Sequence, residues 1–110
     1  LIQQVLDVVE QDSGRPMERS SLGVARFITH LRYLFTRVGS GRQLEGESAS
    51  IGEAIRVTYT EAHRCARRVG ALLELRLDTT MSDDETAYLA LHIARVTADP
   101  RLQPPGAETS

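Results

Sequence analysis

The sequence contains no lysine and no tryptophan, has one cysteine, and is poor in aromatic residues, which make up 5% of its 110 residues. The single cysteine, Cys65, excludes an intramolecular disulfide and any metal site built from several cysteines, and it suits a reducing compartment. Because aromatic residues are scarce, aliphatic side chains must fill the core. The formal net charge of −2 lacks the basic excess typical of nucleic-acid-binding surfaces, so we expect no direct RNA or DNA contact by this chain.

Long hydrophobic runs are missing as well. No stretch approaches the roughly 20 consecutive apolar residues that a membrane-spanning helix needs. No charged segment followed by an apolar one marks a secretory signal at the start. We therefore expect no membrane contact and a cytoplasmic location. The chain begins Leu1-Ile2-Gln3 rather than with methionine, so we expect it to be a segment of a larger protein whose output lies in other domains.

Hydrophobic side chains recur at helical spacing along most of the chain, and no alternating strand pattern of useful length is present. The length suffices for one domain with its own core. The pattern predicts an all-α fold, a compact bundle of five helices within a domain of residues 1–98, followed by a disordered, proline-rich tail at 99–110. The expected helices are 1–11, about 21–38, two between Ile51 and about Leu77 with a break near Tyr59–Glu61, and about 83–97.

Polar segments with glycine or proline mark the helix ends. Asp12–Pro16 stops the first helix, because glycine caps helices and proline cannot continue one. Residues 40–50 are polar and contain glycine and serine, and we expect a surface loop there. Ser82 is followed three residues later by Glu85, which predicts a capping box at the start of the last helix.

Two of the three histidines share a local setting. His30 lies in FITHLRYLFTR, where Arg26 precedes it by four residues and Arg37 follows it by seven. Side chains at these spacings lie on one face of a helix, so both guanidinium groups can lie beside the imidazole. We expect both arginines to stabilise a negative charge placed on that ring, because arginine forms short, forked hydrogen bonds with phosphate.

The second histidine of this kind, His92, lies in ETAYLALHIAR. Arg95 follows it by three residues and Tyr88 precedes it by four, so all three share a face. Arg95 can stabilise phosphate, and Tyr88 can support the ring or fill the core. A neutral imidazole nitrogen is nucleophilic near pH 7, so the pattern fits a phosphoryl acceptor. A single histidine beside an arginine is nevertheless more often a partly buried, hydrogen-bonded side chain.

Both segments resemble a known family. FITHLRYLFTRV and ETAYLALHIARV strongly resemble the two signature helices of the PTS regulation domain, a module of transcriptional antiterminators and sugar-operon activators. The segment from Tyr59 to Ala66 resembles the family's short motif of a tyrosine, an acidic residue and a buried cysteine or alanine. The resemblance covers about residues 1–97, and its two histidine motifs occur in the family's order, about sixty residues apart.

The resemblance implies that His30 and His92 are phosphorylated by components of the sugar phosphotransferase system, with the phosphocarrier protein as the usual donor. It implies a five-helix bundle that forms a homodimer, and phosphorylation that shifts the dimer between forms. The THLRY variant is similar to the second of two tandem copies in antiterminators, where modification activates. Such a module is regulatory, is not an enzyme and needs no cofactor. RNA or DNA contact then falls to other domains, of an antiterminator or of a DNA-binding operon activator.

Other interpretations stay open beside this one. A metal site would need His30, His63 and His92 to converge, and neither HxxxH nor HExxH spacing is present. The acidic run Asp83–Glu85 can serve acid–base catalysis with a histidine, but it suits the positive N-terminus of a helix better. Cys65 carries no nucleophile signature and is expected to pack as a small apolar residue.

The remaining alternatives concern surfaces. Arg64, Arg67 and Arg68 form a basic cluster that we interpret as a solvated helix face, because Glu61 and Glu74 dilute it. The main alternative function is a constitutive helical dimerisation scaffold whose histidines are not phosphorylated. An independent hydrolase or transferase has no residue constellation behind it.

Overall fold

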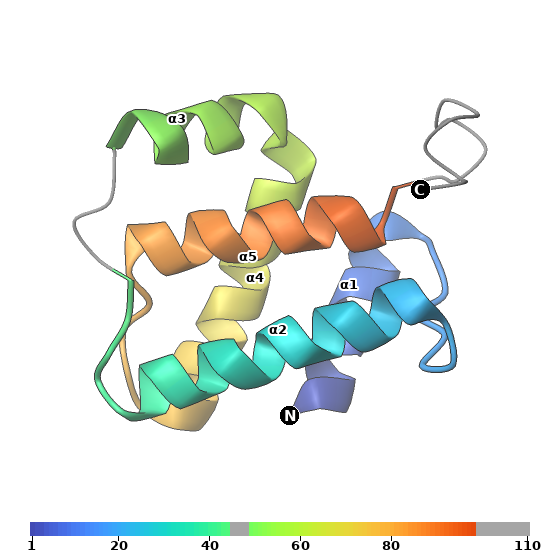
Figure 1. Ribbon diagram of the computed structural model, residues 1–110, viewed down its shortest axis with the longest axis horizontal. Helices are drawn as coiled ribbons and strands as arrows, with labels where there is room; N and C mark the ends of the chain where they lie inside the picture. The colour runs from blue at the N-terminus through green and yellow to red at the C-terminus, as the bar shows by residue number, and fades with distance from the viewer. Residues whose placement is uncertain (45–48, 99–110) are drawn as a thin grey trace.

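The computed structural model describes residues 1–44 and 49–98, and five α-helices make up most of these ranges (Figure 1). The helices are α1 (Ile2–Ser13), α2 (Leu22–Gly39), α3 (Ala49–Thr58), α4 (Thr60–Leu77) and α5 (Asp83–Val96). The predicted all-α bundle of five helices is therefore confirmed. The expected tail at residues 99–110 lies outside the described residues.

Local sequence signals account for the helix ends. Gly14 ends α1 in the left-handed conformation, with φ of 70°, and its N–H donates to the carbonyl of Glu10. The Ser21 hydroxyl caps α2 by accepting the N–H of Val24. The non-helical backbone of Tyr59 separates α3 from α4, as the sequence predicted.

The start of α3 differs from the prediction. The sequence places it at Ile51, the first residue of the apolar pattern, whereas the helix begins at Ala49. Ala49 and Ser50 add nothing to the apolar pattern that starts at Ile51. Hydrophobic periodicity therefore finds Ile55, which packs partly buried against the core, but not the first residues of this helix.

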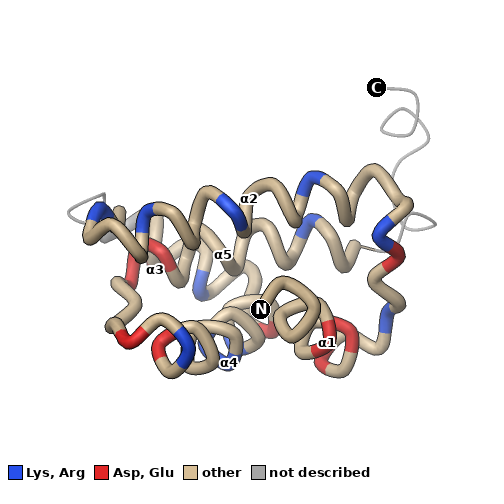
Figure 2. Tube along the Cα trace, turned by 90° about the horizontal axis from the view of Figure 1, so that it is seen from below, with Lys and Arg blue, Asp and Glu red and all other residues tan. Residues whose placement is uncertain are grey.

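The helices form two crossing layers (Figures 1 and 2). In one layer α2 and α5 lie side by side and antiparallel, and in the other α1 and α4 run across them. α5 also packs against α3, so it lies between α2 and α3. The antiparallel arrangement brings the C-terminal end of α2 beside the N-terminal start of α5, and it places the middles of the two helices next to each other.

Aliphatic side chains fill the space between the layers, as the scarcity of aromatic residues requires. The buried cluster comprises Val5, Leu6, Val9, Val24, Phe27, Leu31, Leu34, Val38, Cys65, Ala66, Val69, Leu73, Leu89, Ala90 and Ile93. The small side chains of Ala66 and Ala90 have no exposed surface and lie on α4 and α5. Small residues at such positions let packed helices approach each other closely.

Two leucines on α4 offer a matched test of this core. Leu73 is fully buried and Leu75 is 80% exposed. Leu73→Ala should lower the free energy of unfolding by about 2–5 kcal/mol, because it leaves a cavity where the layers meet. Leu75→Ala should change it by less than about 0.5 kcal/mol. Urea denaturation followed by circular dichroism measures both, and equal losses would contradict the packing described.

Candidate functional site

The two histidines that the sequence singled out meet in the interface between α2 and α5. The imidazole of His30 on α2 stacks on that of His92 on α5, with ring centroids 3.7 Å apart and ring planes inclined by 23°. The antiparallel arrangement of the two helices brings them together, since each histidine lies near the middle of its helix. Two residues far apart in the sequence therefore form one composite group, the histidine stack.

A tyrosine and an arginine continue the row beyond the stack. The Tyr88 ring meets His92 edge-to-face, with centroids 4.4 Å apart and an angle of 68°. The Arg37 guanidinium carbon lies 5.2 Å from the centroid of the Tyr88 ring, within the range of a cation–π interaction. Tyr88 thus lies between Arg37 and the stack and contacts His92, the first of the two positions that the sequence left open for it.

The two stacked histidines differ in their access to solvent. His92 is 7% exposed, and its Nε2 atom is buried without a hydrogen-bond partner. His30 is half-buried. Burial, together with the neighbouring His30, Arg95 and Arg37, lowers the pKa of His92 from its ordinary 6.5 to about 4. His92 is therefore a neutral imidazole at pH 7.

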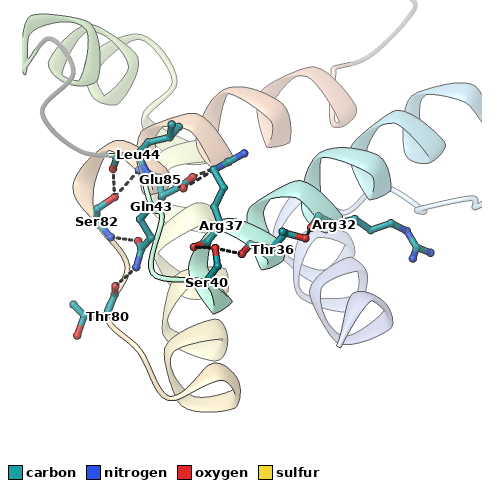
Figure 3. Close-up of polar contacts among 9 residues, drawn as sticks. All are labelled: Arg32, Thr36, Arg37, Ser40, Gln43, Leu44, Thr80, Ser82 and Glu85. Atoms are coloured by element: carbon teal, nitrogen blue, oxygen red, sulfur yellow. Dashed lines mark hydrogen bonds and ion pairs between the residues drawn. The ribbon is translucent and has the colours of Figure 1, made fainter.

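An ion pair lies beside this row, at the end of α2 and the start of α5 (Figure 3). Arg37 donates two hydrogen bonds to the Glu85 carboxylate, from Nε at 2.7 Å and from a terminal nitrogen at 2.8 Å. The Glu85 side chain has no exposed surface, and that of Arg37 is 23% exposed. The hydrogen bond and the charge of Glu85 raise the pKa of Arg37, although burial opposes this. The pair neutralises a charge that burial would otherwise disfavour.

Glu85 also holds the segment that follows α2. Its carboxylate accepts the N–H of Leu44 at 3.0 Å, a third hydrogen bond. The Gln43 side chain donates to the carbonyl of Thr80 at 2.6 Å and accepts the N–H of Ser82 at 2.8 Å. We call residues 43–44 the strap, because they tie the end of α2 to the start of α5 (Figure 3). The expected surface loop at 40–50 is thus half-buried at these two residues.

The capping box predicted at Ser82 and Glu85 is half correct. The Ser82 hydroxyl accepts the Glu85 N–H at 3.1 Å, as predicted, and it also donates to the carbonyl of Leu44 at 2.6 Å. The other half, in which the Glu85 side chain would accept the Ser82 N–H, is wrong. The Gln43 side chain accepts that N–H, and the Glu85 carboxylate accepts from Arg37 instead. A long-range ion pair in a buried position outweighs a local cap that water can replace.

The three arginines proposed to stabilise phosphate lie in different places. Arg37 is bound by Glu85, and Arg26 and Arg95 are exposed. Because α2 and α5 are antiparallel, Arg26 near the start of α2 and Arg95 near the end of α5 lie toward the same end of the pair, away from Arg37. The charge of Arg95 contributes to the low pKa of His92.

His63, the third histidine of the metal-site interpretation, lies on α4 and not on α2 or α5. His63, on α4, is half-buried, and its pKa is lowered by burial and by Arg67 and Arg56, against an opposing effect of Asp83. Within residues 1–44 and 49–98, no group of three potential ligands is placed to hold a metal ion.

Cys65 is buried and contributes to the core. Burial and Asp12 raise the pKa of its thiol to about 12. The thiolate is the nucleophilic form of cysteine, so this thiol is a poor nucleophile at neutral pH.

Sequence reasoning missed the role of Glu85, which it interpreted as an acid at a helix N-terminus. A signal was present in the spacing: Arg37 follows His30 by seven residues, and Glu85 precedes His92 by seven. If the two helices are antiparallel and the histidines meet, Arg37 and Glu85 must also meet, about 10 Å along the interface.

None of the described helices has the length and hydropathy needed to cross a membrane.

The low pKa of His92 has a consequence for stability. Because folding lowers this pKa, protonation favours the unfolded chain, so the stability contributed by neutral His92 is present above pH 6.5 and is lost as the pH falls toward 4. His92→Leu should be no less stable than the parent at pH 7, because it removes a buried nitrogen without a partner. Its urea midpoint should fall less than the parent's between pH 6.5 and 4. An equal fall would contradict the burial of a neutral imidazole, and Leu75→Ala, which removes no titratable group, serves as the control.

The sequence is similar to several bacterial proteins over most of its length. The sequence is 26% identical over 96 residues to the transcription antiterminator LicT of Bacillus subtilis, covering 87% of this chain and 35% of that protein. It is 28% identical over 99 residues to the beta-glucoside operon antiterminator of Dickeya chrysanthemi, covering 90% and 35%. It is 25% identical over 93 residues to the protein GlcT of Staphylococcus haemolyticus, covering 84% and 32%. The chain thus spans about a third of the length of these curated relatives.

No solved structure matches the chain significantly. The model of the PRD domain family, in contrast, matches residues 3–96, a range that runs from the first turn of α1 to the last residue of α5. Both stacked histidines and the Arg37–Glu85 ion pair fall within it. The chain therefore belongs to the PRD domain family and is homologous to transcription antiterminators.

Proposed function

We propose that this domain is the regulatory phospho-acceptor and dimerisation module of a bacterial transcriptional regulator of the antiterminator type. In this proposal the sugar phosphotransferase system phosphorylates it on histidine. The observation that carries the proposal is the stack of His30 on His92 between α2 and α5. Since the chain spans about a third of its relatives' length, we assign RNA or DNA contact to other domains of the full-length protein.

The chemistry needs only an imidazole nitrogen with a free lone pair. That nitrogen attacks the phosphorus of a phosphohistidine on the donor, a new N–P bond forms, and the donor's N–P bond breaks. The donor imidazole leaves neutral, and the acceptor ring keeps the proton on its other nitrogen, so no proton has to enter or leave. The low pKa of His92 favours this, because the ring is unprotonated at pH 7.

The two rings differ in exposure, and this difference sets the order in which a donor can phosphorylate them. His30 is half-buried, so a donor protein can reach it in this conformation, whereas the Nε2 atom of His92 is buried. Modification of that atom requires α2 and α5 to separate locally. A phosphoryl group bonded to a ring nitrogen extends in the plane of that ring and carries a charge of about −1.5 to −2 at pH 7, so on His92 it has to displace the groups that bury Nε2. Phosphorylation therefore repacks the interface between α2 and α5.

A neighbouring apolar surface offers a route from this repacking to dimerisation. A groove between α3 and α5 is lined by apolar side chains, including Leu44, Ile55 and Leu91, and also by Tyr88. Ile51 at its edge is 61% exposed. Because Tyr88 contacts His92, a change in the stack alters the wall of the groove. A second copy of the domain that packs on this surface would respond to the charge.

Phosphotransfer labelling tests the proposal. The domain is incubated with phosphoenolpyruvate, the general phosphotransferase enzyme and the phosphocarrier protein, and the acid-labile phosphate is mapped by mass spectrometry. We expect phosphate on the stack, with His30→Ala reducing uptake most strongly, because His30 is the accessible ring. His63→Ala is the matched control and should leave uptake unchanged, since His63 lies on α4.

Analytical ultracentrifugation of the same samples completes the test. A shift in the monomer–dimer equilibrium on phosphorylation is the expected result. Phosphate on neither His30 nor His92, or an equilibrium that is the same with and without phosphate, would instead favour the constitutive scaffold.

A further inference from the structure

The buried carboxylate of Glu85 depends on a single cation. Its side chain has no exposed surface, and it accepts two hydrogen bonds from Arg37 and one from the Leu44 N–H. Arg37 is its ion-pair partner among the described residues. If Arg37 were drawn away, the carboxylate would keep one neutral donor in a site that water does not reach. A buried charge that loses its partner is strongly destabilised, so its surroundings must open to admit water.

The same arginine lies at the end of the row that leads to the histidine stack. Its guanidinium carbon is 5.2 Å from the Tyr88 ring centroid, which is 4.4 Å from the His92 centroid. The guanidinium therefore lies within 10 Å of the His92 ring, and its charge contributes to the low pKa of that ring. A phosphoryl group extends several ångströms from a ring nitrogen and the arginine side chain is long, so a modest change of rotamer can join them.

The competition between the two anions is unequal. The Glu85 carboxylate carries one negative charge, whereas a phosphoryl group carries about −1.5 to −2 and offers three acceptor oxygens. Arginine binds phosphate in the same forked geometry in which it now binds Glu85. A phosphoryl group on either histidine of the stack is therefore the stronger partner for Arg37.

We propose that Arg37 exchanges partners when the histidine stack is phosphorylated, leaving Glu85 for the phosphoryl group and thereby releasing the strap at residues 43–44 from the start of α5. The proposal rests on the proposed function, since it needs a phosphorylated histidine. It identifies Glu85 as a positioning residue that acts through Arg37. It also identifies the structural change that phosphorylation produces, which is the loss of the Leu44 N–H bond to the Glu85 carboxylate.

Release of the strap would reach beyond the stack. The strap leads into the segment before α3, and Leu44 lines the groove between α3 and α5. The Ser82 hydroxyl, which caps α5, is also bonded to the Leu44 carbonyl. Opening the Glu85 contact therefore loosens both the first turn of α5 and one wall of an apolar surface.

Amide hydrogen exchange of the full chain, measured by NMR before and after phosphorylation, tests this exchange. We expect the Leu44 N–H to exchange at least about tenfold faster after phosphorylation, because it loses a bond to a charged acceptor. The Val24 N–H, bonded to the Ser21 hydroxyl at the far end of α2, is the internal control and should not change. In Glu85→Gln an acceptor for Leu44 remains, but no buried charge loses its partner when Arg37 leaves, so phosphorylation should not change Leu44 exchange.

The outcomes separate the two proposals. Phosphate on the stack with unchanged Leu44 exchange overturns the partner exchange and leaves the proposed function standing. Equal acceleration in the parent and in Glu85→Gln also overturns it, because the strap would then open without Arg37. Absence of phosphate from both histidines overturns the proposed function and the exchange together. If Glu85→Gln does not fold, the Arg37 Nε–H resonance of the parent decides instead, because its acceptor should change from Glu85 to the phosphoryl group, and an unchanged resonance on phosphorylation overturns the exchange.

Discussion

The carboxylate of Glu85 is buried without any exposed surface, and the need to neutralise it organises the end of the bundle where α2 and α5 meet. Arg37 supplies the charge, and the Leu44 N–H supplies the remaining hydrogen bond. Through these contacts one side chain of α5 holds α2 and the strap in place. An apolar residue at position 85 would avoid the cost of burying a charge. The ion pair is better explained by the positions that it fixes, because the same contacts hold Arg37 beside Tyr88 and the strap beside α5.

The histidine stack is a second place where the interface departs from the most stable packing. A buried ring nitrogen without a partner is unfavourable, and the neighbouring His30 adds to the burial that lowers the pKa of His92. Functional sites often hold such locally unfavourable arrangements, which the rest of the fold stabilises. Here the aliphatic core between the layers provides that stability. In the function proposed, the added charge would act on the interface between α2 and α5, while the core would hold α1 and α4 in place.

Much of the fold could be predicted from hydrophobic periodicity, because α1, α2, α4 and α5 each bury one face. The five helices and the break at Tyr59 follow from it. The first two residues of α3 do not, since Ala49 and Ser50 precede the apolar pattern that starts at Ile51. The candidate histidines followed from local spacing and from resemblance to a family. What the sequence could not show was the partner of Glu85, because Ser82 three residues before it offers a plausible local alternative. Only the antiparallel pairing of α2 and α5 decides between the two.

A double-mutant cycle between Arg37 and Glu85 tests most directly whether the buried carboxylate depends on its arginine. Arg37→Met alone should lower the free energy of unfolding by about 3–5 kcal/mol, because it leaves a buried charge without a partner. Adding Glu85→Met should recover most of that loss, since the charge that needed Arg37 is then gone. Urea denaturation of the parent, the two single variants and the double variant gives the coupling energy. If the two substitutions are additive within about 0.5 kcal/mol, the ion pair does not hold this end of the bundle together.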